Sequence, residues 1–380
     1  MKNIEEQYLD LLKDILDNGV KKTDRTGTGT LSVFGRQIRH KMSDGFPLLT
    51  TKKMAWKSMV VELIWFLNGD TNIRYLVENN CNIWNGDAYK RYSVIAGMST
   101  QVESLTREEF VEKIKTDSEF AEKWGSLGPV YGKQWRGWSG ASHIPHPGIG
   151  NETSDQEWYR MGINSVANKT IDQIKNSINL LKKDPDSRRN RVSAWNVSKI
   201  EEMVLPPCHT DFQFYTRELT LEEKVDWLNK NYPLYDLGEW SVDKLSDENY
   251  LKEVITEYNV PQRAISLMFN MRSSDIPLGL PFNISSYALL LEIFGKMVNM
   301  VPDELIGNLG DTHIYLNQVD GVKEQLTREP YELPILKHMK TDHFYKSLSE
   351  DLSLFSHLET KDFQIEGYKS HPTIKIPLSN

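Results

Sequence analysis

The sequence predicts a single domain that combines α-helices with β-strands. Apolar residues recur at helical spacing in residues 5–19 and 58–67. In residues 191–197 and 211–215 they alternate or run together, as they do in strands. No Gly/Ser-rich or Pro-rich linker divides the 380 residues, and apolar segments continue on both sides of any cut. Residues 1–380 are therefore predicted to form one domain.

The composition excludes several classes of protein. No stretch approaches the roughly 18 consecutive apolar residues of a membrane span, and the acidic N-terminus lacks the apolar core of a secretory signal. We therefore expect a cytoplasmic protein. The net charge of −8 argues against a general nucleic-acid-binding surface. Two distant cysteines, Cys81 and Cys208, provide neither a disulfide framework nor the paired spacing of a zinc site.

The N-terminal part is predicted to begin with a helix over residues 5–19, which ends at a glycine. A loop dense in Gly, Thr and charge follows at residues 21–30. Residues 31–38 then alternate as a strand does. The helix predicted over residues 58–67 is strongly apolar, yet it carries Glu62. An acid in this position is either a paired core residue or a general base with a raised pKa.

The rest of the chain is predicted to alternate regular elements with insertions. A strand is expected at residues 264–269, a long apolar helix at 284–298 and a shorter helix at 314–326. Three segments are rich in polar, charged or loop-forming residues and carry no chemical motif. These predicted insertions comprise about residues 89–124, 139–168 and 216–262.

Cys208 is the first candidate for chemistry. It follows Pro206 and Pro207, and because proline is excluded from helix interiors, the thiol should lie at an element boundary. Nearby cations would lower its pKa and produce the reactive thiolate. The alternative is a buried structural cysteine.

Arginines provide candidates for binding a phosphate. Arg188 and Arg189 precede a predicted strand, and Arg272 stands beside Ser273. Guanidinium groups pair bidentately with phosphate, although a double arginine is more often a solvated surface feature. Arg25 could join them from its glycine-rich loop, which lacks the Gly-Lys-Ser/Thr ending of a Walker motif.

Three further polar residues have a functional and a structural interpretation. Asn283 stands at the entrance of the apolar helix, where its carboxamide could pair with a pyrimidine edge or could simply cap the helix. His313 and Tyr315 are two residues apart, so they share one face if the chain is extended. They could hold a ribose or be polar core residues.

Taken together, these segments resemble the thymidylate synthase family. The resemblance covers most of the chain outside the three insertions. Besides the segments named above, it rests on Asp-Arg-Thr-Gly-Thr-Gly-Thr at 24–30, Phe-Pro-Leu-Leu-Thr-Thr-Lys-Lys at 46–53, Glu-Leu-Ile-Trp-Phe-Leu at 62–67, Gly-Asp-Thr-Asn-Ile at 69–73 and Gly-Pro-Val-Tyr-Gly at 128–132. It implies an α+β fold in which a large twisted mixed sheet, surrounded by helices, forms the interface of a homodimer.

The resemblance also implies a reaction and a set of site residues. Cys208 would add to C6 of dUMP, and 5,10-methylenetetrahydrofolate, as co-substrate, would supply a one-carbon unit to C5. The implied catalytic residues are Cys208, Glu62, Tyr131, His209, Asp275 and Asn283. Those implied to bind dUMP are Arg25, Arg272, Ser273, Asn283, His313 and Tyr315, with Arg188 and Arg189 from the partner subunit. Those implied to contact folate are Lys52, Ile83, Trp84, Asp275, Gly279 and Tyr368. No metal, membrane or nucleic acid is required.

Three departures from the family pattern bear on the product. Met271 replaces a usual glutamine and Asn270 a usual tyrosine. Residues 83–87 read Ile-Trp-Asn-Gly-Asp, so the second tryptophan of the family motif is lost, and the chain ends in Pro-Leu-Ser-Asn instead of a small apolar residue. Asn-Met-Arg-Ser at 270–273 resembles phage deoxycytidylate hydroxymethylases, and the lost tryptophan and the altered C-terminal residues are consistent with a site that admits water.

The leading hypothesis from the sequence is therefore a dUMP hydroxymethylase of phage type, in which water captures the methylene intermediate and gives 5-hydroxymethyl-dUMP. Such an enzyme would act in the host cytoplasm. A thymidylate synthase, which makes dTMP and dihydrofolate, is the alternative. A remote alternative of another class is an inactive synthase-like binding protein. Because Asn283 is retained, we expect a uracil substrate.

Overall fold

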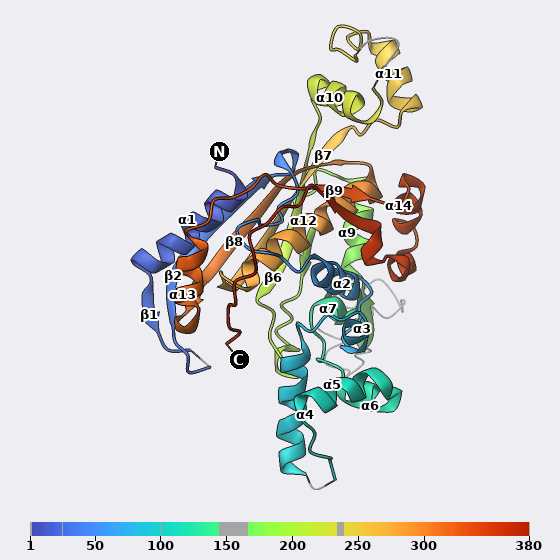
Figure 1. Cartoon of the computed structure of the whole chain (residues 1–380). Coiled ribbons are helices and arrows are strands. Elements are labelled where there is room, and N and C mark those ends of the chain that lie inside the picture. The colour runs from blue at the N-terminus through green and yellow to red at the C-terminus, as the bar shows by residue number, and fades with distance from the viewer. Residues whose placement is uncertain (1, 25, 100, 144–165, 234–238, 380) are drawn as a thin grey trace, which may run out of the picture.

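A six-stranded mixed sheet forms the centre of the molecule (Figure 1). The structure is a computed structural model and describes residues 2–24, 26–99, 101–143, 166–233 and 239–379. The strand order is β1-β2-β8-β7-β6-β5, and all neighbours are antiparallel except the parallel pair β7 and β8. The strands span Val20–Lys22 (β1), Thr30–Lys41 (β2), Arg191–Ser193 (β5), His209–Glu218 (β6), Arg263–Asp275 (β7) and Val301–Tyr315 (β8).

Helices cover the sheet and extend beyond it. One group spans Ile4–Asn18 (α1), Trp56–Leu67 (α2), Tyr131–Gly137 (α7), Gln173–Lys183 (α9), Gly279–Val298 (α12), Val319–Gln325 (α13) and Asp342–Leu348 (α14). The others span Arg74–Glu78 (α3), Asn85–Met98 (α4), Arg107–Thr116 (α5), Ser118–Trp124 (α6), Leu221–Asn231 (α10) and Glu248–Glu257 (α11). Short 3₁₀ turns lie at Met42–Asp44, Ile200–Glu202, Leu316–Gln318 (η3), Leu352–His357 and Thr360–Asp362.

Two small antiparallel pairs complete the fold. They are formed by β3 (Trp138–His143) with β4 (Val166–Ile171), and by β9 (Ile335–His338) with β10 (Phe363–Glu366). The first pair overlaps both ends of the predicted insertion at 139–168. The loop-like structure expected there was wrong at these ends, because residues 138–143 and 166–171 pair as strands.

Several predicted elements are confirmed. α1 begins at a capping box formed by Asn3 and Glu6. α2 begins two residues before the predicted start, and the strands predicted at 31–38, 211–215 and 264–269 correspond to β2, β6 and β7. The α+β class with a large mixed sheet is therefore confirmed.

Three predictions in the C-terminal half need correction. The helix predicted over 314–326 is instead the end of β8, followed by η3 and α13. The helix predicted over 284–298 begins at Gly279, so Asn283 lies inside it. The N-cap is Leu278, and the interpretation of Asn283 as an ordinary cap was wrong. The strand predicted at 191–197 is only three residues long.

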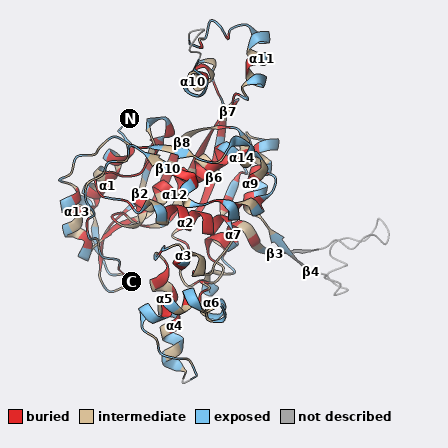
Figure 2. Cartoon of the chain, turned by 45° about the vertical axis from the view of Figure 1, so that its right-hand side comes forward, coloured by how far each residue is buried: buried red, intermediate tan, exposed pale blue. Residues whose placement is uncertain are grey.

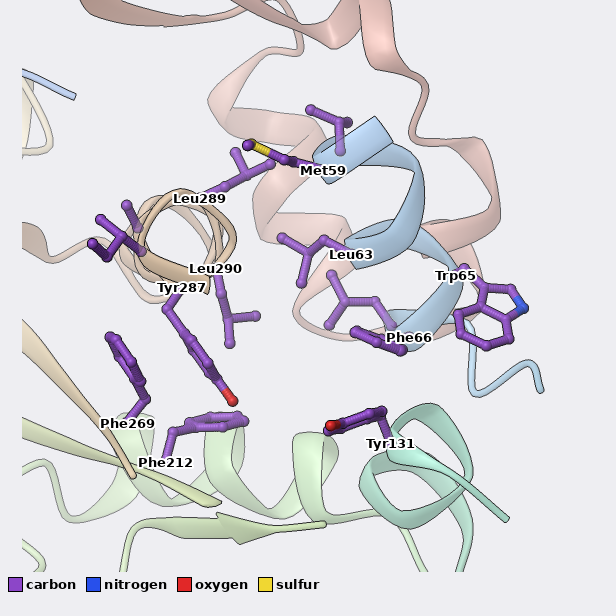
Figure 3. Packing of buried hydrophobic residues seen from close by; sticks show 14 of the residues in the cluster. Met59, Leu63, Trp65, Phe66, Tyr131, Phe212, Phe269, Tyr287, Leu289 and Leu290 are labelled. Carbon is purple, nitrogen blue, oxygen red and sulfur yellow. The ribbon is translucent and has the colours of Figure 1, made fainter. Parts of the chain in front are cut away.

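The core fills the space between the sheet and the helices α2 and α12. Figure 3 shows Tyr287 of α12 beside Phe269 and Phe212 of the sheet, while Leu63 and Phe66 of α2 approach from the other side. The rings of Phe269 and Tyr287 are stacked, with centroids 4.6 Å apart. Burial of such aromatic side chains provides the main driving force for this packing.

The segment that contains α10 and α11 has a small apolar cluster of its own. Val225, Leu228, Trp240, Leu245 and Val254 are buried in it. Figure 1 shows the two helices standing away from the body of the molecule, and Figure 2 shows how much of their surface is exposed. The assignment of residues 1–380 to one domain with three insertions remains a prediction.

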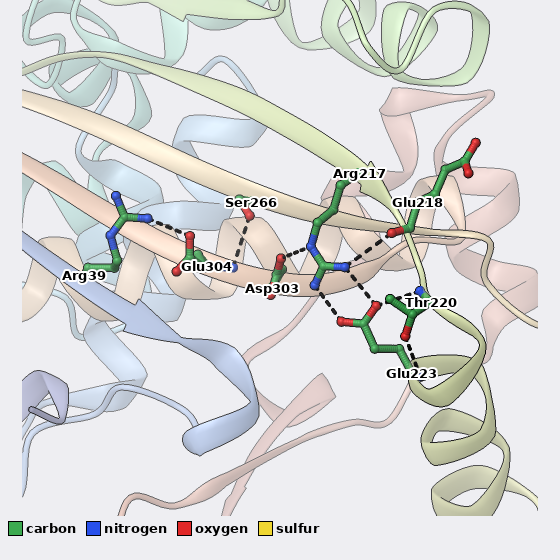
Figure 4. Close-up of polar contacts among 8 residues, drawn as sticks. All are labelled: Arg39, Arg217, Glu218, Thr220, Glu223, Ser266, Asp303 and Glu304. Carbon is green, nitrogen blue, oxygen red and sulfur yellow. Dashed lines mark hydrogen bonds and ion pairs between the residues drawn. The ribbon is translucent and has the colours of Figure 1, made fainter. Parts of the chain in front are cut away.

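Arg217, near the end of β6, links this segment to the sheet (Figure 4). Its guanidinium donates to both carboxylate oxygens of Glu223 at 2.8 and 2.7 Å, and to Asp303 of β8 at 2.9 Å. Glu223 also completes the capping box of α10 with Thr220. One arginine therefore holds both the start of α10 and a sheet strand.

Candidate active site

Cys208 lies directly before β6, with its backbone held on both sides. Its N–H donates to the hydroxyl oxygen of Tyr131 at 2.8 Å, and its carbonyl accepts from the N–H of Arg272 at 2.9 Å. The residue is half-buried. The predicted position of the thiol at an element boundary is confirmed.

Arg272 supports the segment that carries the cysteine. Its Nε donates to the carbonyl of Pro207 at 2.8 Å and its Nη2 to that of Pro206 at 2.9 Å. The guanidinium lies over the ring of Trp195, 5.4 Å from the centroid. A guanidinium has five N–H donors, so this exposed side chain retains donors for an anion. A positive charge is thus held beside Cys208.

The other predicted phosphate ligands are distributed differently. Ser273 follows Arg272 in β7, opposite Asp311 of β8. Arg188 and Arg189 are exposed in the turn before β5, and the adjacent Asn190 accepts from the N–H of Phe214 at 3.1 Å. Phe214 is six residues along β6 from Cys208, about 20 Å in an extended strand. A single chain therefore does not bring these two arginines to the thiol.

Arg25 lies outside the described residues. Its neighbours form a tight turn in which Asp24 accepts from the backbone N–H groups of Thr26 at 2.7 Å and Gly29 at 2.6 Å. The backbone of Gly29 also accepts from the N–H of Leu316. This loop is therefore anchored next to the end of β8.

Glu62 is the predicted acid on the apolar helix α2. It accepts from the indole N–H of Trp84 at 2.7 Å. Burial raises the pKa of Glu62 to about 7, against the opposing effect of this hydrogen bond. The carboxyl group can therefore both accept and release a proton near neutral pH.

His209 lies close to Glu62 and is an uncharged group. Its ring stacks on Tyr131, with centroids 4.1 Å apart, and its Nδ1 is 2.7 Å from the hydroxyl oxygen of Tyr287. Burial lowers the pKa of His209 to about 3. The imidazole is therefore uncharged at physiological pH and offers hydrogen bonds without charge.

A small cavity joins these groups, with about 10 Å³ available to the centre of a water molecule. This is close to the space that one water needs. The residues that line it are Glu62, Leu63, Phe66, Trp135, His209, Asn283, Ser286 and Tyr287. Among the described residues, Trp135 Nε1 and Ser286 Oγ have no hydrogen-bond partner, although both are buried. The cavity therefore offers polar contacts to a small polar group.

A second polar cluster lies at the end of β7. Asp275 accepts from the N–H of Leu278 at 3.2 Å and from Nε2 of Gln318 at 3.1 Å. Burial raises the pKa of Asp275, while Gln318, His313 and Lys52 act in the opposite direction. The Lys52 ammonium donates to the carbonyl of Pro277, and burial lowers the pKa of Lys52 to about 8.

The predicted ribose ligands lie where β8 ends. His313 and Tyr315 are both in β8, and their rings meet edge to face with centroids 5.2 Å apart. The expectation that they share one face is confirmed. His313 Nδ1 is 3.2 Å from Asp311, whose carboxylate also accepts from Lys22 at 2.9 Å and Ser32 at 2.7 Å. Asp311 thereby orients the imidazole.

The remaining predicted folate residues occupy several segments. Trp84 is buried, and Ile83 before it is half-buried. Gly279 is the first residue of α12. The Tyr368 hydroxyl donates to the carbonyl of Leu49 at 2.8 Å and accepts from the N–H of Met54 at 3.1 Å.

Sequence reasoning missed four polar residues of the site, namely Trp135, Ser286, Tyr287 and Gln318. Tyr287 follows Asn283 by four positions, and this helical spacing could have identified it as a neighbour. Nothing in the local pattern identifies Gln318, because its partners come from β7 and from the C-terminal segment.

Two features are absent from the described part of the chain. None of its helices is long and apolar enough to cross a membrane. It also contains no group of three or more His, Cys, Asp or Glu residues arranged to hold a metal ion.

Comparison with known proteins identifies the family. The sequence profile of the thymidylate synthase family matches residues 6–228 and 237–380. Similar proteins include thymidylate synthases of Mycoplasma mobile (39% identical over 374 residues, 98% of this chain and 99% of the relative) and Mesoplasma florum (38% over 369 residues, 97% and 98%). That of Listeria innocua is 38% identical over 391 residues, 98% of this chain and 99% of the relative. The chain therefore belongs to the thymidylate synthase family.

Proposed function

We propose that this protein converts dUMP to dTMP with 5,10-methylenetetrahydrofolate, the co-substrate of its family, and releases dihydrofolate. The observation that carries this proposal is the position of Cys208. Its backbone is held by Tyr131 and Arg272, close to a wall formed by Glu62 and His209. Such a site suits a reaction that needs a thiolate, a base and an uncharged hydrogen-bonding surface.

In this proposal Cys208 is the nucleophile. Its thiolate adds to C6 of dUMP, and C5 then carries the negative charge as part of an enolate. The charge of Arg272 stabilises the thiolate over the thiol. C5 forms a bond to the one-carbon unit of the folate, which leaves the C5 proton to be removed.

Glu62 is the candidate for handling protons. A carboxyl group with a pKa of about 7 is half ionised at neutral pH, which is the condition for efficient general acid–base catalysis. Its cavity also contains the side chain of Asn283, which would pair with the uracil edge. Through a bound water, Glu62 can exchange a proton with this edge.

The other assignments follow from their location. Arg272 and Ser273, with Arg25, would bind the phosphate, and His313 and Tyr315 would bind the ribose. Lys52, Ile83, Trp84, Asp275, Gly279 and Tyr368 would surround the folate. We further propose that Arg188 and Arg189 reach the phosphate from a second subunit, since a single chain holds them about 20 Å from Cys208.

A dUMP hydroxymethylase is the second candidate, and it rests on the loss of the second tryptophan. Its place is taken by Asp87 in the first turn of α4, close in sequence to Trp84. A polar residue here could admit water to the methylene intermediate. The related proteins with 38–39% identity are named thymidylate synthases, which favours reductive methylation over the hydroxymethylase reaction.

The departures in β7 support the second candidate less well. Asn270 donates to Asp211 at 2.7 Å and accepts from Asn308 at 2.9 Å, within a row of polar side chains that crosses the sheet. Met271 is buried, and its sulfur accepts from Ser274. Neither residue lines the cavity beside Glu62.

Trapping of the covalent adduct tests the proposal. With 5-fluoro-dUMP the base finds no proton at C5, so an adduct of enzyme, nucleotide and folate should accumulate and be visible by mass spectrometry of the intact protein. Cys208→Ala should form no adduct and show no turnover. Cys81→Ala is the matched control, because burial raises the pKa of Cys81 to about 12 and keeps this thiol protonated. Adduct formation by Cys208→Ala would contradict the proposal.

A further inference from the structure

Gln318 makes an unusual set of contacts for a residue outside the predicted site. It lies in η3, directly after β8, and its side chain is fully buried (0% exposed). Its Oε1 accepts from the N–H of Tyr315 at 3.0 Å. Its Nε2 donates to Asp275 Oδ2 and to the carbonyl of Pro377, each at 3.1 Å.

These contacts fix the orientation of the carboxamide. The N–H of Tyr315 can only donate, so it must face the amide oxygen of Gln318. The carboxylate of Asp275 and the carbonyl of Pro377 can only accept, so each takes one of the two amide hydrogens. A buried carboxamide with all three contacts satisfied is costly to disturb, because each freed group would lack a partner.

Asp275 depends on this contact for its charge. Burial raises its pKa, and the hydrogen bond from Gln318 is the largest of the effects that oppose burial. The charges of His313 and Lys52 and the N–H of Leu278 act in the same direction as Gln318. Loss of the amide donor should therefore leave the carboxylate less stable.

The C-terminal segment, residues 374–379, lies against η3 and α13. Ser379 donates to Asn317 at 3.2 Å. A Cβ atom at Gly321 would be 3.3 Å from atoms of Ile374 and of Ile376, so the segment passes close to the helix surface. Pro377 is thus placed where its carbonyl meets Gln318.

We infer that Gln318 is a positioning residue that couples docking of the C-terminal segment to the orientation of Asp275. When the segment is docked, the Pro377 carbonyl holds one amide hydrogen and directs the other toward Asp275. When the segment leaves, the carboxamide loses an anchor and Asp275 loses a fixed donor. Coupling of this kind is reciprocal, so the carboxylate of Asp275 also helps to hold the segment.

A double-mutant cycle on docking tests the coupling without reference to activity. The rate of trypsin cleavage after Lys375 reports how often the segment opens. Gln318→Leu and Asp275→Ala should each raise this rate about five- to tenfold, as expected for one or two lost hydrogen bonds. In the double variant the rate should be no higher than in Gln318→Leu. Unchanged rates in the single variants, or multiplicative effects in the double variant, would overturn the inference.

Gln325→Leu is the matched control. Gln325 is also a fully buried glutamine, at the end of α13, and it donates to Thr51 and accepts from Tyr8. It contacts neither Asp275 nor Pro377 in these hydrogen bonds, so cleavage after Lys375 should stay within about twofold of the wild-type rate. Equal acceleration in this variant would mean general loosening and would contradict the coupling. If Gln318→Leu does not fold, Gln318→Glu retains the shape but has no amide donor, and the same acceleration is expected.

The consequence for turnover rests on the proposed function. Gln318→Glu should raise the KM for methylenetetrahydrofolate about fivefold or more, with the KM for dUMP changed less than twofold, and should shift the pH profile because a second carboxyl group faces Asp275. A parallel rise in both KM values would indicate a merely structural role. If the wild-type protein does not convert dUMP, the proposed function fails, while the cleavage experiment still decides whether the coupling exists.

Discussion

Two half-buried acids of the site, Glu62 and Asp275, lie in different surroundings. Glu62 lies on α2 with one hydrogen-bond donor, the indole of Trp84, and it lines a cavity whose other polar side chains, such as His209 and Asn283, are uncharged. Asp275 lies at the end of β7 with two donors, Gln318 and the N–H of Leu278, and with cationic groups nearby.

This difference in surroundings explains how two carboxyl groups in one site can have separate roles. Burial raises the pKa of both acids, but at Asp275 hydrogen bonds and positive charge oppose the rise. We therefore expect Glu62 to transfer protons and Asp275 to act as an anion that binds and orients. The following predictions test this division.

Glu62→Gln should have the largest effect. The variant retains an acceptor for the Trp84 indole but cannot exchange a proton near pH 7. Turnover should fall by about 10²- to 10⁴-fold, with little change in the affinity for dUMP. Steady-state kinetics with binding measured separately would check this. A loss smaller than about tenfold would remove Glu62 from the proton-transfer role.

Asp275→Asn should have a smaller and different effect. It removes a charge but retains the size of the side chain, and hydrogen bonds to charged groups contribute roughly 1.5–3 kcal/mol. We expect kcat/KM for methylenetetrahydrofolate to fall about 10- to 100-fold, while the dependence of turnover on Glu62 ionisation is retained. Loss of the pH profile in this variant, instead of in Glu62→Gln, would reverse the assignment of the two acids.

The stability of the protein should also depend on pH through Glu62. Its pKa is raised from 4.5 to about 7, so between these values the native state retains a proton that the unfolded state releases. The free energy of unfolding should therefore decrease as the pH rises from about 5 to about 8, by roughly 2–3 kcal/mol from this group. Glu62→Gln lacks this contribution. Urea denaturation of both proteins at the two pH values should show this difference. If the free energy of unfolding changed equally with pH in both proteins, the raised pKa of Glu62 would be contradicted.

Arg217→Met should have the smallest effect, because Arg217 contacts neither Glu62 nor Asp275 in its hydrogen bonds. It removes the contacts to Glu223 and Asp303 that attach α10 to the sheet. Because the guanidinium is partly exposed, the loss should be about 1 kcal/mol or less. Faster proteolysis within α10 and α11 with unchanged turnover is expected. A large loss of turnover would show that this segment contributes to the site.

Local sequence predicts some elements of the fold and of the site, but not others. α1, α2 and most of α12 follow from helical periodicity, and Cys208 at an element boundary follows from the two prolines before it. β8 was missed, although it pairs with both β2 and β7. Its proline and glycines interrupt any alternating pattern, and pairing on both sides supplies the stability that local preference does not.

One glycine of β8 shows why local rules failed there. A Cβ atom at Gly310 would lie 2.9 Å from the backbone oxygen of Arg272 and 3.0 Å from that of Met271. The glycine is needed for close approach of β8 to β7, so it is part of the strand and does not interrupt it. Gln318 was missed for a related reason, since its role depends on residues far away in sequence.

Analysis of the products decides whether this protein makes dTMP. The wild-type protein would be incubated with dUMP and methylenetetrahydrofolate while dihydrofolate is followed by absorbance and the nucleotide is identified by mass spectrometry. We expect dTMP, with one dihydrofolate released for each dTMP formed. Formation of 5-hydroxymethyl-dUMP without dihydrofolate would contradict this expectation and support the hydroxymethylase, and the absence of any nucleotide product would contradict both.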